Sequence, residues 1–347
     1  MNEQVHDRDL LKTFEELGFV TCSSQVVSLL QRAMRAAQAS DITVLLDGET
    51  GTGKQVLARS IHQLDQKRNT FPFITVHCST ISEALAESEL FGHQRGAFSG
   101  AVSDRKGLFQ AAHRGTLLLD DVNDLPVHIQ PKLLDVIQRG TVRAVGSDKE
   151  TPVDVRIIAA CNQSLEPLVR KGCFRADLYH RLNVVNLPLP PLRERKGDLK
   201  HLILSFAKRY SRLYEPITDV DPQLLTLLQS ENFPGNVREL ENAVQRMLFL
   251  KIEGTSLSTC DWIAQAGPED GRIDKDPIAE AASAMWTAIS QRGVSYASAF
   301  LEIEKKVLET AIHFDGSTRR EIAQRLKTSE RTLYYKMRAH GLSHPAP

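Results

Sequence analysis

The chain has 347 residues, enough for two or three domains with hydrophobic cores of their own. Its 41% apolar and 25% charged residues are typical of a globular protein and exclude global disorder or one long coiled coil. The 43 Lys and Arg residues balance the 43 Asp and Glu residues, which argues against a nucleic-acid coat protein, although a neutral total can hide a local basic patch.

The five cysteines are scattered and none forms a C-x-x-C pair, which argues against a zinc ribbon or a thioredoxin-type site. Such a set is typical of reduced thiols in a cytoplasmic protein. The N-terminus lacks the apolar core of a signal peptide, and no stretch approaches the ~18 apolar residues that a membrane helix needs. We therefore expect a cytoplasmic protein without membrane contact.

The first two thirds of the chain predict an α/β subdomain. Residues 1–17 are polar and charged, and we expect them to form a short N-terminal extension. Residues 18–196 alternate between helix-like stretches and short apolar strands, which predicts a parallel sheet with helices on both faces. The expected strands are Thr43–Leu46, Phe73–His77, Thr116–Leu119 and Val155–Ala160. The expected helices include Gln55–Leu64 and Pro131–Arg139.

The remaining segments are helical in pattern. Residues 197–265 have helical periodicity and no convincing strand, which predicts a separate helical subdomain. Residues 266–295 contain Gly, Pro and acidic residues and are interpreted as a linker, with a short helix around Ala282–Ile289. Residues 296–347 are expected to form an all-α domain. Its predicted helices are Ala297–Phe314, Thr318–Leu326 and Glu330–Ala339.

A glycine-rich loop follows the first expected strand and fits the pattern G-x-x-x-x-G-K. In such a loop, backbone N–H groups turn inward around phosphate oxygens, and the next helix adds its N-terminal partial positive charge. Lys54 would reach the β- and γ-phosphates as a point charge. A Gly-rich turn without a ligand is the alternative, which the strand–loop–helix setting disfavours. The candidate nucleotide-binding residues here are Gly48, Glu49, Thr50, Gly51, Thr52, Gly53, Lys54 and Gln55.

Two carboxylates, Asp120 and Asp121, end the apolar strand at Thr116–Leu119. In a parallel sheet this end of the strand lies beside the phosphate loop, at the carboxyl edge where ligands bind. Asp120 would hold hydrated Mg²⁺, a hard cation that takes oxygen ligands. Asp121 would position or polarise the attacking water. A solvated acidic turn is the alternative for this pair taken alone.

The stretch 96–101 reads GAFSGA, a small, flexible loop with one large apolar residue at its centre. An exposed Phe98 would forgo a burial benefit of roughly 1.5–3 kcal/mol, so it is a candidate partner contact. The alternative is that Phe98 tucks back onto its own domain, and the residues alone do not decide between the two.

This loop resembles the GAFTGA loop of the sigma-54-dependent activators, a branch of the AAA+ ATPases. Further segments agree in the same order: GETGTGK, ELFGHQRGAFSGA, GTLLLDD, RIIAACN, FRADLYHRLNVV, LPPLRER and FPGNVREL. The similarity covers roughly residues 18–262. It implies an AAA+ fold, an ATP- and Mg²⁺-dependent ATPase, and a ring, usually a hexamer, with each ATP site between neighbouring subunits; a dimer is possible at rest.

The resemblance also assigns roles to individual residues. Asp120 and Asp121 match the Walker B pair, and Asn162 matches the sensor I region, where a polar side chain can detect the γ-phosphate. Arg175 and Arg181 match the arginine fingers, whose guanidinium groups are supplied to the next subunit. A further arginine, Arg238, matches sensor II on the helical lid. For each arginine the alternative is a surface ion pair of little energetic value.

By the same resemblance, the GAFSGA loop grips sigma-54, and ATP hydrolysis moves it to remodel a closed promoter complex into an open one. A second loop, about Arg139–Thr151, would support it. The sigma-54-contact residues are Gly96, Ala97, Phe98, Ser99, Gly100 and Ala101.

Four residues depart from the family pattern. Ser99 replaces the usual Thr and keeps only its hydroxyl, and Asp121 replaces the usual Glu, which withdraws the carboxylate by one methylene. His77 stands where an Asn commonly holds the Walker B Glu in an off state, and Gln55 replaces a usual Glu. We hypothesise that Asp121 and His77 are matched changes on facing strands.

The C-terminal helices resemble the Fis-type helix-turn-helix domain, whose pattern is matched here by ERTLYYKMRAHGL. Residues 317–340 contain seven Lys or Arg and two Glu, a local net charge of +5 (7 − 2). Lys327 replaces a Gly often found in the turn, and a solvated helical tail is the alternative. The residues expected at double-stranded DNA are Ser329, Arg331, Thr332, Tyr335 and Lys336.

Two other functions are weighed against this interpretation. One is a DNA-binding regulator that keeps the AAA+ fold but no longer remodels sigma-54, which the altered Gln55, Ser99 and Asp121 keep open. The other is a different ring ATPase, such as a chelatase subunit or a helicase loader, which the GAFSGA loop and terminal helices disfavour. We expect no regulatory domain before residue 18. The activity would then be controlled by expression or by a protein acting in trans; a truncated gene model is the third alternative.

Overall fold

The computed structural model describes residues 2–83, 85–210, 216–251, 254–263, 286, 296–313, 319–326, 330–340 and 342. The chain divides into two compact units, residues 1–265 and 266–347, which are described separately. Within the described residues, no helix combines the length and the apolar character needed to cross a bilayer.

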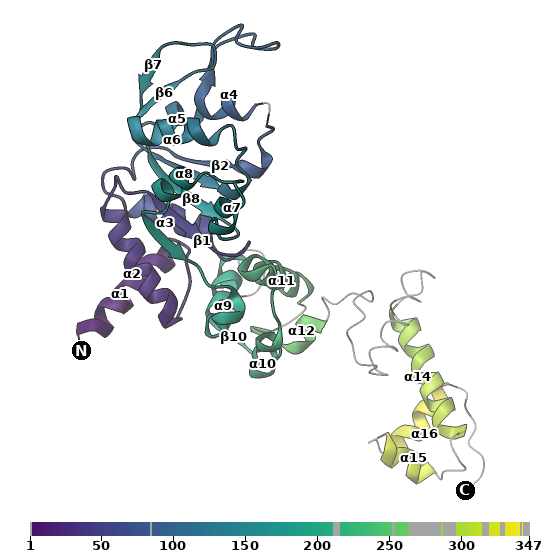
Figure 1. Cartoon of the computed structure of the whole chain (residues 1–347). Coiled ribbons are helices and arrows are strands. Elements are labelled where there is room, and N and C mark those ends of the chain that lie inside the picture. Colours follow the sequence, from purple (N-terminus) through teal and green to yellow (C-terminus); the bar gives the residue numbers. More distant parts are fainter. Residues whose placement is uncertain are drawn as a thin grey trace. The chain divides into compact units, whose positions relative to one another are not determined.

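The first unit is built on a five-stranded parallel sheet in the order β2-β5-β8-β1-β9 (Figure 1). The four predicted strands are confirmed within a residue of their expected ends, whereas the edge strand β9 was not predicted. That strand is short and lies on the rim of the sheet, so its sequence carries little apolar signal. The strands are β1 (Val44–Asp47), β2 (Phe73–His77), β5 (Thr116–Asp120), β8 (Arg156–Cys161) and β9 (Val185–Pro188).

Both faces of the sheet are buried, which explains why its central strands read as continuous apolar runs. Along β5, Leu117 and Leu119 pack into one core cluster while Leu118 packs into the other, because successive side chains point to opposite faces. The helices that pack on the sheet are α2 (Ser24–Gln38), α3 (Lys54–Leu64), α4 (Ala86–Phe91), α5 (Leu108–Ala111), α6 (Gln130–Arg139), α7 (Glu166–Arg170) and α8 (Ala176–Leu182), with short 3₁₀ turns η1 (Cys78–Thr80) and η2 (Val122–Asp124).

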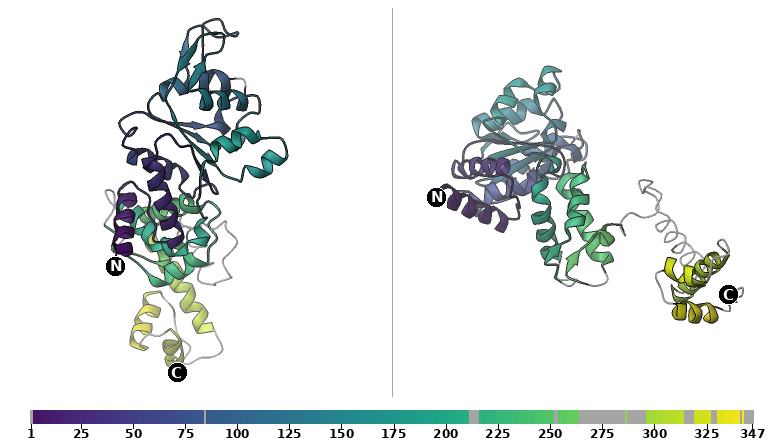
Figure 2. Two further views of the ribbon diagram at one scale, coloured as in Figure 1. Left: turned by 60° about the vertical axis from the view of Figure 1, so that its left-hand side comes forward. Right: turned by 90° about the horizontal axis from the view of Figure 1, so that it is seen from below.

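Residues 1–17 are more than a polar extension. They form helix α1 (Asn2–Glu16), which lies beside α2 (Figures 1 and 2). Phe14 is fully buried, and Leu10 is 9% exposed, in the same core cluster as β1. The helix therefore belongs to the core of the first unit, although its charged outer face hides this in the sequence.

Two small hairpins were not predicted. One joins β3 (Gly92–His93) to β4 (Arg105–Lys106) and carries the GAFSGA loop. The other joins β6 (Thr141–Arg143) to β7 (Glu150–Pro152), inside the second loop expected from the sequence. Both lie at the end of the unit away from the lid helices (Figures 1 and 2). Strands of two or three residues are too short to leave a readable alternation of side chains.

The lid is helical as predicted, but the expectation that it contains no strand was wrong. Two-residue strands β10 (Asp219–Val220) and β11 (Ser256–Leu257) pair in parallel. Its helices α9 (Leu199–Tyr210), α10 (Pro222–Ser230), α11 (Asn236–Leu250) and α12 (Thr259–Ile263) share one apolar core, preceded by 3₁₀ turns η3 (Leu192–Glu194) and η4 (Lys196–Asp198).

The second unit contains α14 (Tyr296–His313), α15 (Arg319–Arg325) and α16 (Glu330–Ala339). The three helices meet at a small core of Leu308, Ile322, Ala323, Leu333 and Met337. Both Lys336 and His340 contact the carboxylate of Glu304, which ties α16 to α14. The expected helix at Ala282–Ile289, apart from residue 286, and the expected turn at 327–329 lie outside the described residues.

The burial of α1 is tested by Phe14→Ala. Removal of a fully buried phenylalanine leaves a cavity, so we expect the free energy of unfolding to fall by about 3–5 kcal/mol. Denaturant unfolding followed by circular dichroism measures the change, with Lys12→Ala on the exposed side of the same helix as control. Equal stability of the two variants would show that α1 is dispensable for the core.

Candidate nucleotide-binding site

The phosphate loop joins the carboxyl end of β1 to the first turn of α3. Gly53 caps α3 with φ 107°, and Gly51 has φ 82°, both in the left-handed region that favours glycine. A Cβ on Gly51 would come within 2.2 Å of the Gly235 carbonyl oxygen in the lid. The glycines predicted from the pattern are therefore required by the turn and by close contact with the lid.

Lys54 lies beneath this loop and is only 7% exposed. Its Nζ donates to the carbonyl oxygens of Gly48 at 2.6 Å and Glu49 at 3.0 Å. Burial lowers the pKa of Lys54, and the carboxylates of Asp120 and Asp121 oppose that shift. The acid pair thus favours a charged lysine at the position expected for phosphate contact.

Asp120 ends β5 and is 6% exposed. Its Oδ2 accepts a hydrogen bond from Gln55 Nε2 at 2.6 Å and lies 3.2 Å from Nδ1 of His77. The strand register pairs His77 with Asp120. The direct contact of His77 is thus with Asp120, while its charge acts on Asp121 only through electrostatics. The hypothesis that His77 and Asp121 are matched changes stays a prediction.

Asp121 follows directly and adopts φ 51°, ψ 49° at the start of η2, an uncommon conformation for a residue other than glycine. Asn162, just beyond β8, donates from Nδ2 to Asp121 Oδ1 at 3.2 Å. Burial, and then the neighbouring Asp120 carboxylate, raise the pKa of Asp121. A raised pKa makes the carboxylate a better proton acceptor, which suits a general base.

The acid pair fits a nucleotide-borne Mg²⁺. Among the described residues, no group of three or more His, Cys, Asp or Glu side chains could hold a metal alone. Mg²⁺ usually keeps several waters and binds through one or two carboxylates together with substrate phosphates. Asp120 and Asp121, beside the phosphate loop, supply a donor set of that kind.

The candidate arginines lie apart from the phosphate loop, except for Arg238. The backbone N–H of Arg238 approaches the Gly51 carbonyl at 3.4 Å, which places the start of α11 against the loop. Arg175 is exposed and makes a bidentate pair with Asp177 at 2.8 and 3.1 Å. Its predicted role therefore requires that it leave this ion pair.

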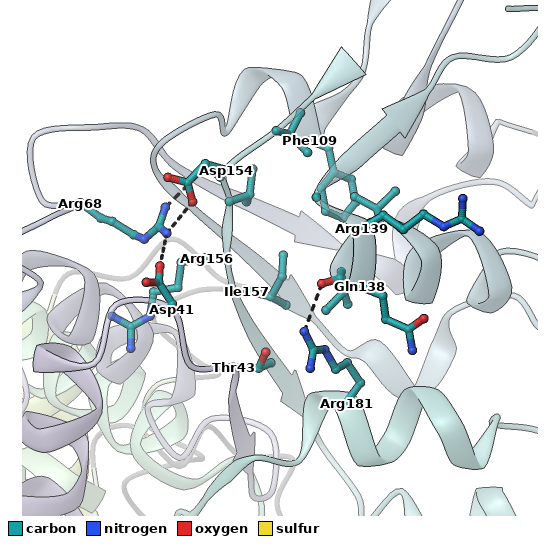
Figure 3. Close-up of a pocket in the computed structure, with 15 residues that line it drawn as sticks. Asp41, Thr43, Arg68, Phe109, Gln138, Arg139, Asp154, Arg156, Ile157 and Arg181 are labelled. Atoms are coloured by element: carbon teal, nitrogen blue, oxygen red, sulfur yellow. Dashed lines mark hydrogen bonds and ion pairs between the residues drawn. The ribbon is translucent and has the colours of Figure 1, made fainter. Parts of the chain in front are cut away.

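Arg181 lines an open cavity of about 310 Å³ together with Thr43, which precedes β1, and Arg156, which begins β8 (Figure 3). Its Nη2 donates to the Ile137 carbonyl at 3.4 Å. The cavity thus lies at the amino edge of the sheet, whereas the phosphate loop follows the carboxyl end of β1. Arg181 therefore lies at the opposite edge of the sheet from the phosphate loop of this chain.

The GAFSGA loop is closed by a hydrogen bond from Gly96 N–H to the Ala101 carbonyl at 2.8 Å. Phe98 is 38% exposed, and its ring stacks edge-on against His93 with centroids 5.0 Å apart. His93 in turn contacts Ser88 Oγ at 2.6 Å. Phe98 is thus partly exposed and partly packed on its own domain. The structure therefore lies between the two alternatives, an exposed partner contact and a buried side chain.

The segment after β6 lies against this loop. Gln94 N–H donates to the Val145 carbonyl at 3.0 Å, and a Cβ on Gly146 would come 2.9 Å from the Cβ of Ala97. The expected support of the GAFSGA loop by the segment 139–151 is confirmed.

In the second unit, the expected DNA-contacting residues Arg331, Thr332, Tyr335 and Lys336 lie on α16, while Ser329 lies outside the described residues. Tyr335 is 55% exposed. Lys336 pairs with Glu304, so its ammonium group is partly neutralised within the unit.

Comparison with known proteins shows which family has this fold and site. Residues 19–188 match the sigma-54 interaction domain, and residues 193–265 match the AAA+ ATPase lid domain. The regulatory protein AtoC of Escherichia coli strain K12 is 35% identical over 338 residues, which are 97% of this chain and 71% of AtoC. The chain belongs to the sigma-54 activator family of AAA+ proteins.

Other family members agree. SfnR of Pseudomonas fluorescens, a sigma54-dependent transcriptional regulator, is 50% identical over 216 residues, 62% of this chain and 59% of SfnR. The crystal structure of NtrX from Brucella abortus in complex with ADP matches with a TM-score of 0.66 at 28% identity, covering 93% of this chain and 70% of that one. The predicted AAA+ fold with a helical lid is confirmed.

Sequence reasoning missed three residues that this family member places against its phosphate loop. Arg193 and Asn236 contact Glu49, and Arg195 donates from Nη2 to the Thr52 carbonyl at 2.6 Å. They stand in the LPPLRER and FPGNVREL segments that carry the resemblance, so the family motifs were the available signal. These contacts form only in the tertiary structure, where the lid packs against the phosphate loop.

Replacement of Asp121 tests its predicted role as general base. We expect Asp121→Asn to keep nucleotide affinity and to lose ATP hydrolysis by about 10²-fold or more, because the amide cannot accept the proton of the attacking water. Phosphate release and binding of a fluorescent nucleotide measure the two quantities. Asp124→Asn, which changes an exposed carboxylate on the same turn, is the matched control. A comparable loss in both variants would contradict a specific role for Asp121.

Proposed function

We propose that the chain binds ATP with Mg²⁺, hydrolyses it, and uses the energy to remodel the closed complex of sigma-54 RNA polymerase into the open complex. The observation that carries this proposal is the meeting of the phosphate loop, Asp120–Asp121 and Asn162 at one sheet edge, in a chain that also presents a braced GAFSGA loop. The family membership supports the same role.

In the proposed reaction, the loop N–H groups and Lys54 bind the phosphates, while Asp121 accepts a proton from the water that attacks the γ-phosphorus. The bond from the γ-phosphorus to the β–γ bridging oxygen breaks, and ADP leaves with that oxygen. Asp120 would hold Mg²⁺, which when bound would supply positive charge at the phosphates. Asn162 is bonded to Asp121, so loss of the γ-phosphate can change the position of that pair.

The position of Arg181 supports a ring. Its cavity lies at the opposite edge of the sheet from the phosphate loop of its own chain, so Arg181 would act on the nucleotide of a neighbour. We propose the same role for the exposed Arg175. We propose a homo-oligomeric ring, a hexamer as in the family pattern, with a dimer as an alternative at rest.

A packed path supports transmission from the acids to the loop. After Asp121, η2 contacts η1, which follows His77 at the end of β2. Cys78 and Val122 share a core cluster with Leu90 of α4, and α4 leads to His93 and so to Phe98. We propose that movement of Asp121 reaches the loop along this path.

A DNA-binding regulator with impaired remodelling is the second candidate. The observation that favours it is that Gln55 and His77 both contact Oδ2 of Asp120, and these contacts compete with magnesium ligation. Open-complex formation by the purified wild-type chain separates the two functions. Regulation by a protein acting in trans remains a proposal for either one.

The loop is tested by Phe98→Ala in an in vitro transcription assay with sigma-54 polymerase and hydrolysable ATP. We expect open-complex formation to fall roughly tenfold or more, since a lost aromatic anchor typically costs ~2 kcal/mol or more, while basal ATPase persists. Val127→Ala, an exposed apolar residue outside the loop, serves as control. Full open-complex formation by Phe98→Ala would remove the proposed role of the loop.

DNA binding by the second unit is tested by Lys336→Ala. We expect weaker binding to duplex DNA and a decrease of about one in the slope of log affinity against log salt, because one phosphate contact is lost. Fluorescence anisotropy across a salt series measures both. Lys305→Ala, which breaks an ion pair with Glu309 within α14, is the control. An unchanged salt slope in Lys336→Ala would contradict a phosphate contact at this residue.

A further inference from the structure

The carboxylate of Glu49 projects from the phosphate loop and is held from outside the α/β core. Arg193 donates from Nη2 and Nη1 to Oε1 and Oε2 at 2.6 and 2.8 Å, a bidentate pair. Asn236 donates from Nδ2 to Oε2 at 3.2 Å. The contact with Arg193, and then the one with Asn236, lower the pKa of Glu49 to about 2. Glu49 therefore stays ionised in neutral solution.

Asn236 joins three segments through one amide. Its Oδ1 accepts the N–H of Leu192 at 2.8 Å, and its Nδ2 also contacts the Thr50 carbonyl at 3.0 Å. The residue is fully buried and has φ 54°, a conformation that asparagine tolerates better than most residues. The 3₁₀ turn η3, the start of α11 and the phosphate loop thus meet at one buried side chain.

The backbones of the loop and the lid also touch. Val237 N–H donates to the Gly51 carbonyl at 3.0 Å, next to the close approach of Gly51 to Gly235. A change in the shape of the loop therefore cannot leave the start of α11 where it is.

We infer that Arg193 and Asn236 are positioning residues that hold the phosphate loop, through Glu49, in the shape that receives a nucleotide, and that couple this shape to the lid. The inference rests on the proposed nucleotide binding. Arg193 and Glu49 are 39% and 40% exposed, so their pair adds little to global stability. A pre-organised loop instead increases nucleotide affinity, because the loop loses less conformational entropy when the nucleotide binds. By linkage, the lid contacts strengthen binding as much as the nucleotide strengthens the lid contacts.

The test is a double-mutant cycle on the full chain, read as the dissociation constant for fluorescently labelled ADP. Arg193→Ala and Glu49→Gln are each expected to weaken binding about fivefold or more, and the double variant is expected to be no weaker than either single one. Arg193→Lys keeps the charge but loses the bidentate geometry, so its affinity should fall between wild type and Arg193→Ala. Thermal unfolding midpoints should stay near that of the wild type.

Lys200→Ala is the matched control, because it breaks an ion pair of the lid with Asp219 that does not involve the phosphate loop. We expect it to bind the labelled ADP as the wild type does. Glu49→Gln is nearly isosteric and tests the same contact if Arg193→Ala does not fold. Wild-type affinity in folded Arg193→Ala, or losses that simply add in the double variant, would overturn the inference alone. Failure of the wild type to bind the nucleotide would overturn the proposed function as well.

Discussion

The adjacency of β5, β8 and β1 in a parallel sheet is the constraint on which the candidate site depends. Parallel strands bring their carboxyl ends to one edge, so residues that are far apart in the chain meet there, such as Gln55 with Asp120 and Asp121 with Asn162. Asp120 ends β5, Asn162 follows β8, and Lys54 follows the loop after β1. Burial of both sheet faces by α1–α8 keeps this order, because β1, β5 and β8 each contribute side chains to both core clusters.

Charge balance in a desolvated place then shapes the site. Burial works against the charged forms of Lys54 and Asp121 alike, and their mutual attraction compensates in part. The same lysine bonds to the carbonyls of Gly48 and Glu49, so the loop, the cation and the acid pair form one electrostatic unit. A change of charge or position in the loop, in Lys54 or in the acid pair therefore alters the electrostatic energy of the other two.

The contacts at the acid pair explain two of the departures from the family pattern. Gln55 and His77 both reach Asp120, whereas Asp121 keeps its contact with Asn162. Gln55 and His77 thus hold the first acid, and Asn162 contacts the second. On the far side of the loop, Glu49 connects the site to the lid, so the phosphate loop lies between two sets of restraints.

The sequence by itself determined the local elements and the candidate loop, because glycine spacing, apolar strands and the acids after β5 depend on neighbouring residues. The family motifs added Asn162 and the arginines. Only the tertiary structure decided that His77 faces Asp120, since that follows from strand register, and that α1 joins the core, since its apolar stripe is narrow. The contact of Asn236 with Glu49 spans 187 positions. Such contacts depend on how the lid folds back on the sheet, which no local pattern encodes.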